Sequence, residues 1–394
     1  MRELGVFPWL AVGLAALAWR TRPETRIRET VTIVALYALL AGASYASVVA
    51  FGMEPRLGPT LAVAALHVSV VAVMLHASRL VGAACDARTS RLPRWARVVV
   101  RTVLADVLVF GALVPALAMS LALHRAPGSL PLPSRPLGLE SRRLALRSAD
   151  GTRIDGVWLS HPRAAGAVLL VHGLGAEKVQ FLAAADGFVS RGFSVLAIDL
   201  RDHGASSGLS STLGLLESED VRAAWAELLA STRDRDMPRV LFGISLGGAA
   251  VNLAAPSLEH VDGIVLDSTF ADVGHIARRW LPLPEGLRDP TLLLARAFAL
   301  PVVGYPVLDV VPAAAARDNR GTYPVLVFHS RRDPMIPFSE AEALVAAYGK
   351  RARLVAFDDV SHPNAHLYAP VAYDRAIGEL CDAIARARNA TPGQ

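Results

Sequence analysis

A serine flanked by glycines is the first feature of this 394-residue chain that could do chemistry. The segment Gly243-Ile244-Ser245-Leu246-Gly247 lies between an apolar run and a run of small residues. A G-x-S-x-G at the junction of a strand and a helix is typical of a nucleophile elbow, where a sharp turn exposes the serine hydroxyl. We therefore interpret Ser245 as a candidate nucleophile, the alternative being an ordinary tight turn.

A serine hydroxyl is a poor nucleophile at neutral pH. It needs a base, and the base needs an orienting carboxylate. In enzymes with such an elbow, the acid and then the histidine follow the serine along the chain, each after a later strand. Asp333 follows the apolar run 325–330, and His362 follows the run 353–359. We predict that Asp333 is the acid and that His362 is the base.

Three nearby residues are alternatives to this pair. His366 lies four residues after His362, and we prefer His362 because it is closer to the end of the predicted strand. Asp358 and Asp359 are interpreted as surface groups at a strand end, although either carboxylate could replace Asp333 as the acid.

The negative charge that develops on the substrate oxygen needs hydrogen-bond donors that are fixed before the reaction. The backbone N–H of Leu246, directly after the serine, is one candidate. We expect the second donor in the loop after the apolar stretch 167–173, where Leu174 follows His172 and Gly173. The predicted oxyanion hole is therefore made of the backbone N–H groups of Leu174 and Leu246.

Apolar strands that alternate with helices position these residues in the last two thirds of the chain. Continuous apolar runs, as in buried parallel strands, occur at 167–173, 194–200, 239–245, 263–268, 325–330 and 353–359. A half-exposed strand is predicted at 151–160, and helices are predicted at about 212–231, from 246, at 338–349 and at about 370–388. This alternation predicts an α/β fold, a mainly parallel sheet covered by helices on both faces.

The first third of the chain has a different character. Residues 1–123 contain four long apolar runs, which we interpret as transmembrane helices at about 4–19, 31–53, 59–84 and 98–123. The first run is short for a span, and a signal-peptide core is the alternative there. The net charge is +6 in this region and −1 in the rest of the chain, so no basic patch outside it predicts a nucleic-acid partner.

The arginines in the short connecting loops predict the orientation in the membrane. Four lie between the first and second runs and four between the third and fourth, whereas the loop between the second and third holds only Arg56. We expect the two arginine-rich loops in the cytoplasm. The proline-rich segment 124–142 is then an extracytoplasmic linker to a catalytic domain at 143–394.

Residues from about 144 to 388 resemble the α/β-hydrolase superfamily. The motifs that carry the resemblance are LLVHGLG, DLRDHGASSG, GISLGG, LDSTF and HSRRDPMIP, ending with His362. They are similar to those of the branch with membrane-anchored BEM46-like and serine-aminopeptidase-like esterases. The resemblance implies the α/β-hydrolase fold and a Ser245-Asp333-His362 triad.

Three positions depart from the family pattern. Asp202 and Ser330 stand where glycine is usual, and SHPNAH replaces the common GHND-like ending around His362. The histidine assignment therefore rests mainly on its distance from the predicted strand.

These features favour a membrane-anchored serine hydrolase, carboxylesterase-like or lipase-like, that forms an acyl-enzyme on Ser245. The apolar segment 270–322 is expected to form a cap suited to an acyl or lipid-like ester, the alternative being ordinary helix packing on the sheet. No metal or cofactor is implied. A peptidase or amidase on the same fold, and a non-catalytic membrane sensor or scaffold with a relic domain, are the alternative functions.

Overall fold

The computed structural model describes residues 130–390, except 135, 209, 233–235, 282–284 and 304, together with Pro93 and Ala96. The four predicted membrane spans lie outside these residues. Within the described part of the chain, no helix has both the length and the apolar character needed to cross a bilayer. The chain divides into two units, one made of Ser129–Leu281 and Val307–Gln394, the other of Met1–Gly128 and Pro282–Pro306.

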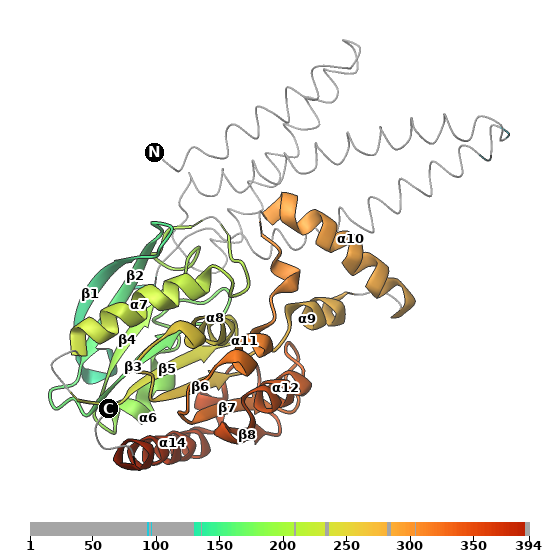
Figure 1. Ribbon diagram of the computed structural model, residues 1–394. Coiled ribbons are helices and arrows are strands. Elements are labelled where there is room, and N and C mark those ends of the chain that lie inside the picture. Colours follow the sequence, from blue (N-terminus) through green and yellow to red (C-terminus); the bar gives the residue numbers. More distant parts are fainter. Residues whose placement is uncertain are drawn as a thin grey trace, which may run out of the picture. The chain divides into compact units, whose positions relative to one another are not determined.

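One sheet of eight strands organises the first of these units, in the order β1-β2-β4-β3-β5-β6-β7-β8 (Figure 1). The strands are β1 (Glu140–Arg147), β2 (Arg153–Ser160), β3 (Gly166–Val171), β4 (Phe193–Ile198), β5 (Arg239–Ile244), β6 (Gly263–Asp267), β7 (Val325–Ser330) and β8 (Ala352–Phe357). β2 is antiparallel to both β1 and β4, and every other pair of neighbours is parallel. The predicted, mainly parallel sheet is confirmed.

Burial explains why the sequence pattern located seven of these strands within two residues. Every residue of β3, β4, β6 and β7 is buried, because helices cover both faces of the sheet. β1 was not predicted, and it begins inside the segment expected to be a linker up to residue 142. Only Leu144 of this edge strand is buried, so its sequence carries little of the apolar signal of a strand.

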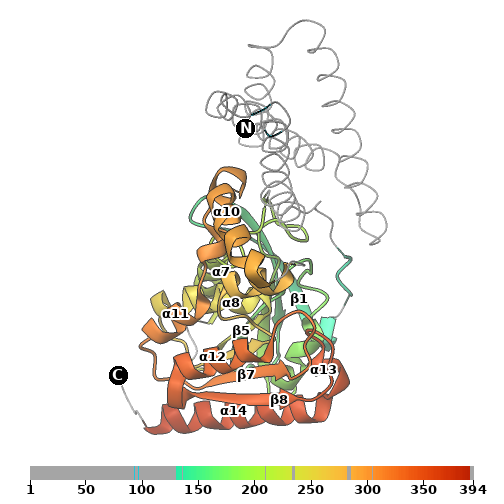
Figure 2. The ribbon, with the colours of Figure 1, turned by 90° about the vertical axis from the view of Figure 1, so that its right-hand side faces the viewer.

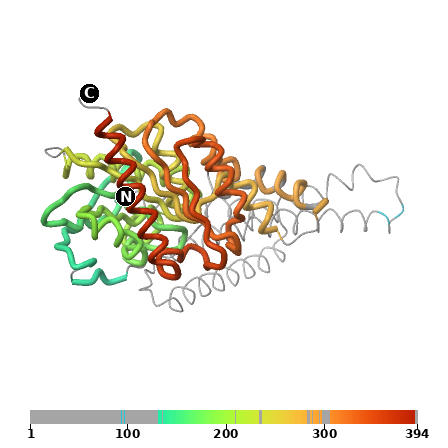
Figure 3. Tube along the Cα trace, turned by 90° about the horizontal axis from the view of Figure 1, so that it is seen from below, coloured from blue at the N-terminus to red at the C-terminus, as the bar shows by residue number. Residues whose placement is uncertain are grey.

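Helices form a layer on each side of the sheet. One layer contains α7 (Glu217–Thr232), α8 (Leu246–Ala254), α11 (Pro312–Asp318) and α12 (Phe338–Tyr348), and the other contains α6 (Asp186–Val189), α13 (Ala365–Tyr368) and α14 (Pro370–Ala390). Figure 2 shows β7 and β8 between α12 and α14. In Figure 3, α14 lies in front of the strands as the dark red helix, so it closes that face.

The segment expected to be a cap, 270–322, does not behave as one piece. It forms α9 (Val273–Trp280), α10 (Glu285–Val303) and α11. α11 packs against α8 and α12, so it belongs to the helical layer on the sheet. The packing of α11 corresponds to the alternative for this segment, ordinary helix packing on the sheet, and the cap stays a prediction. α10 belongs to the second unit.

Candidate active site

Ser245 occupies a sharp turn between β5 and α8. Its backbone has φ +51° and ψ −115°, in the left-handed region that residues other than glycine rarely adopt. Two hydrogen bonds hold the turn: the Ser245 N–H donates to the carbonyl of Asp267 at 2.8 Å, and the Gly248 N–H donates to the carbonyl of Ser245 at 3.0 Å. This strained turn is the geometry of a nucleophile elbow.

Two glycines make this turn sterically possible. A Cβ atom on Gly243 would lie 2.5 Å from the carbonyl oxygen of Gly247, and one on Gly247 would lie 2.3 Å from the carbonyl oxygen of Val171. The strand and the helix therefore pass too closely for any side chain at these two positions.

The structure brings Ser245, His362 and Asp333 together from three separate loops. The Nε2 atom of His362, between β8 and α13, lies 3.0 Å from the Oγ atom of Ser245. The Nδ1 atom of the same ring lies 2.6 Å from Oδ2 of Asp333, between β7 and α12. Both distances are within hydrogen-bond range, so a proton can pass from the hydroxyl to the imidazole while the carboxylate holds the ring.

The environment of Asp333 keeps it ionised. Burial raises the pKa of this carboxyl, but the hydrogen bond to His362 and the N–H groups of Met335 and Ile336 outweigh burial and lower the pKa. Those two N–H groups donate to Oδ1 at 2.8 and 2.9 Å and leave Oδ2 for the imidazole. Asp333 is thus a fixed negative charge that favours the Nδ1–H tautomer of His362.

The alternative residues lie elsewhere. The ring of His366 is buried against Phe181 and Tyr373, at centroid distances of 6.0 and 6.1 Å, and burial lowers its pKa. Asp358 and Asp359 are exposed, as the sequence predicted, and they pair with surface arginines. The geometry thus brings none of these three alternatives to the serine.

Comparison with known proteins agrees with this architecture. The family model described as serine aminopeptidase, S33, matches residues 162–300. The uncharacterized protein Rv2307c of Mycobacterium tuberculosis is 31% identical over 249 residues, which are 61% of this chain and 79% of that protein. The chain belongs to the α/β-hydrolase superfamily. The uncharacterized protein YfhR of Escherichia coli K12 is 26% identical over 223 residues, 55% of this chain and 71% of that protein.

Solved structures show the same fold for this hydrolase. The esterase Pf2001 of Pyrococcus furiosus matches with a TM-score of 0.52 at 18% identity, over 64% of this chain and 96% of that chain. The α/β-hydrolase GrgF of Penicillium sp. sh18 matches with a TM-score of 0.50 at 17% identity, over 63% of this chain and 100% of that chain.

The predicted oxyanion donors of the hydrolase belong to the helix that begins after Ser245 and to the loop after β3. Leu246 is the first residue of α8, so its N–H points out of the positive end of the helix. Leu174 lies in the loop after β3, which approaches the nucleophile closely: a Cβ atom on Gly173 would lie 3.2 Å from the Cβ of Ser245. Within the described residues, neither N–H donates to a protein acceptor. Both donors are therefore available to a substrate oxygen.

A second carboxylate, which was not expected from the sequence, lies near Ser245, His362 and Asp333. Asp267, the last residue of β6, is fully buried and accepts hydrogen bonds from Tyr373 Oη at 2.7 Å and Ser268 Oγ at 2.9 Å. Burial raises its pKa to about 6, and its charge interacts with those of His362 and Asp333. The only signal in the sequence was an aspartate that ends an apolar strand in LDSTF.

Neither a metal site nor the hollow at the amino ends of three strands coincides with Ser245 in the described part of the chain. No group of three or more His, Cys, Asp and Glu side chains in the described part of the chain could hold a metal ion. A hollow of about 640 Å³, lined partly by Ala165, Phe193 and Pro238, lies at the amino ends of β3, β4 and β5. Ser245 follows the carboxyl end of β5, so this hollow lies at the other end of the strand from the candidate nucleophile.

Proposed function

We propose that this hydrolase cleaves carboxylic esters through a covalent acyl-enzyme on Ser245. The observation that carries the proposal is the continuous hydrogen-bonded chain from Asp333 through His362 to a serine on a strained elbow. A serine that meets both a base and an oriented carboxylate has the requirements of an activated nucleophile.

Acylation follows from these distances. As Ser245 Oγ attacks the ester carbonyl carbon, His362 Nε2 takes the hydroxyl proton, and the negative charge of Asp333 stabilises the imidazolium that forms. The carbonyl oxygen becomes an oxyanion, which accepts hydrogen bonds from the N–H groups of Leu246 and Leu174. Collapse of the tetrahedral intermediate breaks the bond to the alcohol oxygen, and His362 returns the proton to this leaving group.

Deacylation repeats the same steps with water. His362 Nε2 removes a proton from a water molecule, whose oxygen attacks the acyl carbon. The second tetrahedral intermediate collapses to the carboxylic acid, and Oγ of Ser245 regains its proton from the imidazolium.

An exposed apolar pair beside the acid loop supports an acyl substrate. Trp280 and Met335 are 50% and 45% exposed, and the Trp280 Nε1–H donates to the Met335 carbonyl at 3.0 Å. Met335 is also one of the residues whose N–H binds Asp333. An apolar surface that is joined in this way to the catalytic loop is suited to the hydrocarbon part of an ester.

Peptide or amide hydrolysis is the second candidate, because the matching family model is described as a serine aminopeptidase. Both activities use the same triad, so the site geometry does not separate them. Comparison of p-nitrophenyl esters with aminoacyl p-nitroanilides distinguishes the two: we expect turnover of the esters, whereas turnover of the anilides alone would favour the peptidase.

We also propose that apolar segments within residues 1–123 anchor the hydrolase in a membrane, with the catalytic unit on the extracytoplasmic side. The support is the length of the apolar runs and the distribution of arginines between them.

A fluorophosphonate probe tests the proposed chemistry, because it reacts only with an activated serine. We expect the wild-type protein to be labelled and Ser245→Ala not to be labelled. Ser190→Ala, which changes a serine at the end of α6, is the matched control and should be labelled like the wild type. An unlabelled wild-type protein that turns over no ester would contradict the proposal.

A further inference from the structure

The loops that follow β3 and β4 are tied to each other by side chains outside the triad. The first loop, 172–178, contains the predicted oxyanion donor Leu174. The second, 199–208, contains His203 and follows β4, the neighbour of β3 in the sheet. The ties consist of two histidines and one buried ion pair, and each joins a backbone N–H of one loop to a side chain.

His172 fixes the peptide that carries the Leu174 N–H. Its Nδ1 atom lies 2.7 Å from the carbonyl oxygen of Gly173, and its Nε2 atom accepts the N–H of Leu200 at 3.0 Å. A ring nitrogen that accepts a backbone N–H carries no proton, so the proton of the neutral ring is on Nδ1 and is donated to Gly173. The Gly173 carbonyl and the Leu174 N–H belong to one planar trans peptide and point in opposite directions. His172 therefore sets the direction of the Leu174 N–H.

His203 fixes the next peptide in the same way. Its Nε2 atom accepts the Gly175 N–H at 3.0 Å, and its Nδ1 atom lies 2.8 Å from the carbonyl oxygen of Arg201. This ring too carries its proton on Nδ1 and is neutral. The centroids of the His172 and His203 rings are 5.1 Å apart. Two consecutive peptides, on either side of Leu174, are thus held by two adjacent imidazoles.

An ion pair closes the end of the first loop. The Lys178 backbone N–H donates to Oδ1 of Asp199 at 2.8 Å, and its ammonium group contacts Oδ2 of the same carboxylate and Oδ2 of Asp155. Burial alone would lower the pKa of Lys178, but the two carboxylates raise it, so the ammonium stays charged. The loop is therefore held at both ends.

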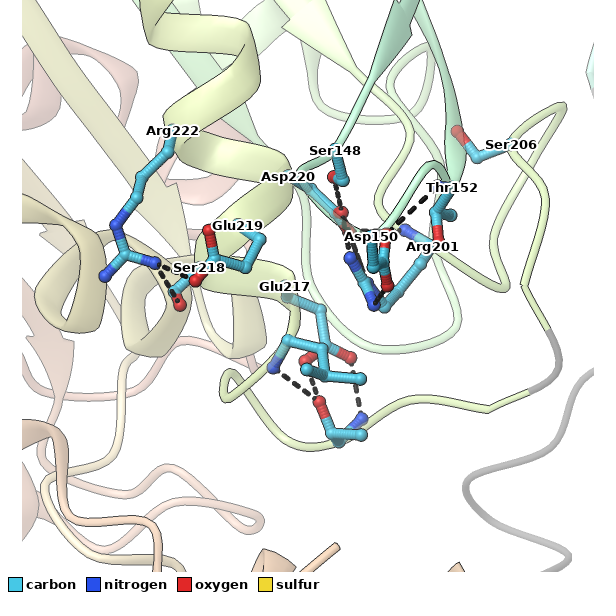
Figure 4. A network of polar contacts seen from close by, with 12 residues as sticks. Ser148, Asp150, Thr152, Arg201, Ser206, Glu217, Ser218, Glu219, Asp220 and Arg222 are labelled. Atoms are coloured by element: carbon cyan, nitrogen blue, oxygen red, sulfur yellow. Dashed lines mark hydrogen bonds and ion pairs between the residues drawn. The ribbon is translucent and has the colours of Figure 1, made fainter. Parts of the chain in front are cut away.

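The second loop is itself anchored, as Figure 4 shows. Arg201 is buried, and its guanidinium donates to both carboxylate oxygens of Asp220 on α7 and to Asp150 at 2.8 Å. Such a forked pair fixes both position and angle. His203, two residues after Arg201, consequently acts from a rigid support.

We propose that His172 and His203 are positioning residues that aim the Leu174 N–H at the oxyanion of the substrate. The proposal rests on the proposed esterase function. The hydrogen bonds of both rings go to backbone groups of the two loops. The rings act through the backbone by orienting the Leu174 N–H. Substitution of the Leu174 side chain would not test this role, because the backbone N–H would remain. The oxyanion forms only on the way through the transition state. A misoriented Leu174 N–H should therefore lower kcat and leave KM nearly unchanged.

The test compares His203→Ala with His203→Gln, whose amide oxygen can occupy the position of Nε2 and accept the Gly175 N–H. We expect His203→Ala to lower kcat for p-nitrophenyl butyrate about 10- to 100-fold, below the full loss of an oxyanion donor, with KM changed by less than about threefold. His203→Gln should recover most of the rate. His172→Asn keeps a donor near the position of Nδ1. Its kcat should likewise be higher than that of His172→Ala.

His161→Ala is the matched control. His161 also accepts a loop N–H, that of Arg163 at 3.2 Å. It follows β2, which is antiparallel to β4, so it lies near the amino end of β4 and away from the two loops. This variant should keep the wild-type kcat. An equal loss of kcat in His161→Ala and His203→Ala would overturn the proposal, because the effect would then be general destabilisation.

Inhibitor binding separates aiming from simple packing. A trifluoromethyl ketone adds to the serine and forms an oxyanion, whereas the methyl ketone of the same chain length binds mainly as a ground-state ligand. His203→Ala should weaken binding of the trifluoromethyl ketone about 10- to 100-fold more than binding of the methyl ketone. Equal weakening of both, or a kcat within twofold of the wild type, would refute a positioning role.

Hydrogen exchange distinguishes failure of the positioning role from failure of the proposed esterase function. The amide of Gly175 should exchange faster in His203→Ala than in the wild type and His203→Gln. If the wild-type protein is neither labelled by a fluorophosphonate nor active on esters, the proposed function is wrong. Faster exchange at Gly175 would then still support the tie to His203, and unchanged exchange would exclude it.

Discussion

The phenol of Tyr373, on α14, donates a hydrogen bond of 2.7 Å to the fully buried carboxylate of Asp267 at the end of β6. This one bond connects the helix that covers one face of the sheet to the strand beside the nucleophile, because the Asp267 carbonyl also accepts the Ser245 N–H. The two residues therefore link the stability of the domain to the geometry of its elbow.

The first prediction concerns how stability depends on pH. Burial raises the pKa of Asp267 from 3.8 to about 6, so the folded protein binds this proton more tightly than the unfolded chain. Stability from this group is present at low pH and is lost as the pH rises from about 4 to 6, by about 3 kcal/mol in total. Asp267→Asn should remove this loss, which urea unfolding between pH 4.5 and 7.5 would measure.

Asp374→Asn is the control for that experiment. Asp374 is exposed, and its hydrogen bond to Arg191 lowers its pKa, so its contribution to stability is lost as the pH falls, the opposite direction. Wild-type and Asp267→Asn proteins whose stabilities change in parallel over the whole range would contradict the assignment.

The second prediction separates the two candidate histidines. Ser245→Ala and His362→Ala should each lower kcat/KM for a p-nitrophenyl ester roughly 10⁴- to 10⁶-fold, because each removes a member of one hydrogen-bonded unit. His366→Ala should stay within about tenfold, since its ring packs against Phe181 and Tyr373. Circular dichroism would check folding. Loss of activity in His366→Ala with retention in His362→Ala would reverse the assignment.

The third prediction concerns the acid. Asp333→Asn should lower kcat on the order of 10⁴-fold, because a neutral amide no longer favours the Nδ1–H tautomer of His362. Asp359→Asn changes an exposed carboxylate paired with Arg332 at 3.8 Å and should keep normal activity. Steady-state kinetics of both variants on the same ester would measure kcat. Equal effects of the two substitutions would count against the role of Asp333.

The fourth prediction concerns the acyl group. Trp280→Ala should lower kcat/KM for p-nitrophenyl octanoate about tenfold more than for the acetate, because the proposed apolar contact with Trp280 and Met335 requires a long acyl chain. Trp280→Phe keeps an aromatic ring without the hydrogen bond to Met335 and should retain the preference. A chain-length series on the three proteins is the measurement. The same loss on acetate and octanoate would show that Trp280 does not select the chain.

The fifth prediction concerns topology. A periplasmic phosphatase reporter fused after residue 130 should be active, because eight arginines in two loops are expected to stay in the cytoplasm. Fluorescence at the same position from a reporter that matures only in the cytoplasm would overturn the proposed orientation.

The candidate site could be predicted from the sequence because each of its residues follows a parallel strand, although β8, which precedes His362, is only partly buried. Continuous apolar runs locate β3, β5 and β7, and residues just beyond such strands meet at one edge of the sheet. β1 lacked that signal because only Leu144 is buried. The transmembrane spans stay a prediction from hydropathy and loop charge.

The ties around the oxyanion loop could not be predicted in this way. His203 and Gly175 are 28 residues apart, and their bond depends on which ring nitrogen carries the proton. The pKa of Asp267 depends on its burial in the folded protein, which raises it, and on the hydrogen bond from Tyr373 of α14, which lowers it. Such properties belong to the packed protein and have no periodicity along the chain.

The division into two units has a practical consequence for any attempt to isolate the catalytic part. Because Pro282–Pro306 belongs with Met1–Gly128, the chain passes from one unit to the other three times. A fragment that starts at Ser129 would carry α10 without the rest of its unit. The side chain of Leu293, on this helix, is exposed. Isolation of the first unit therefore requires two deletions, of the residues before Ser129 and of the segment 282–306, with a short linker from Leu281 to Val307.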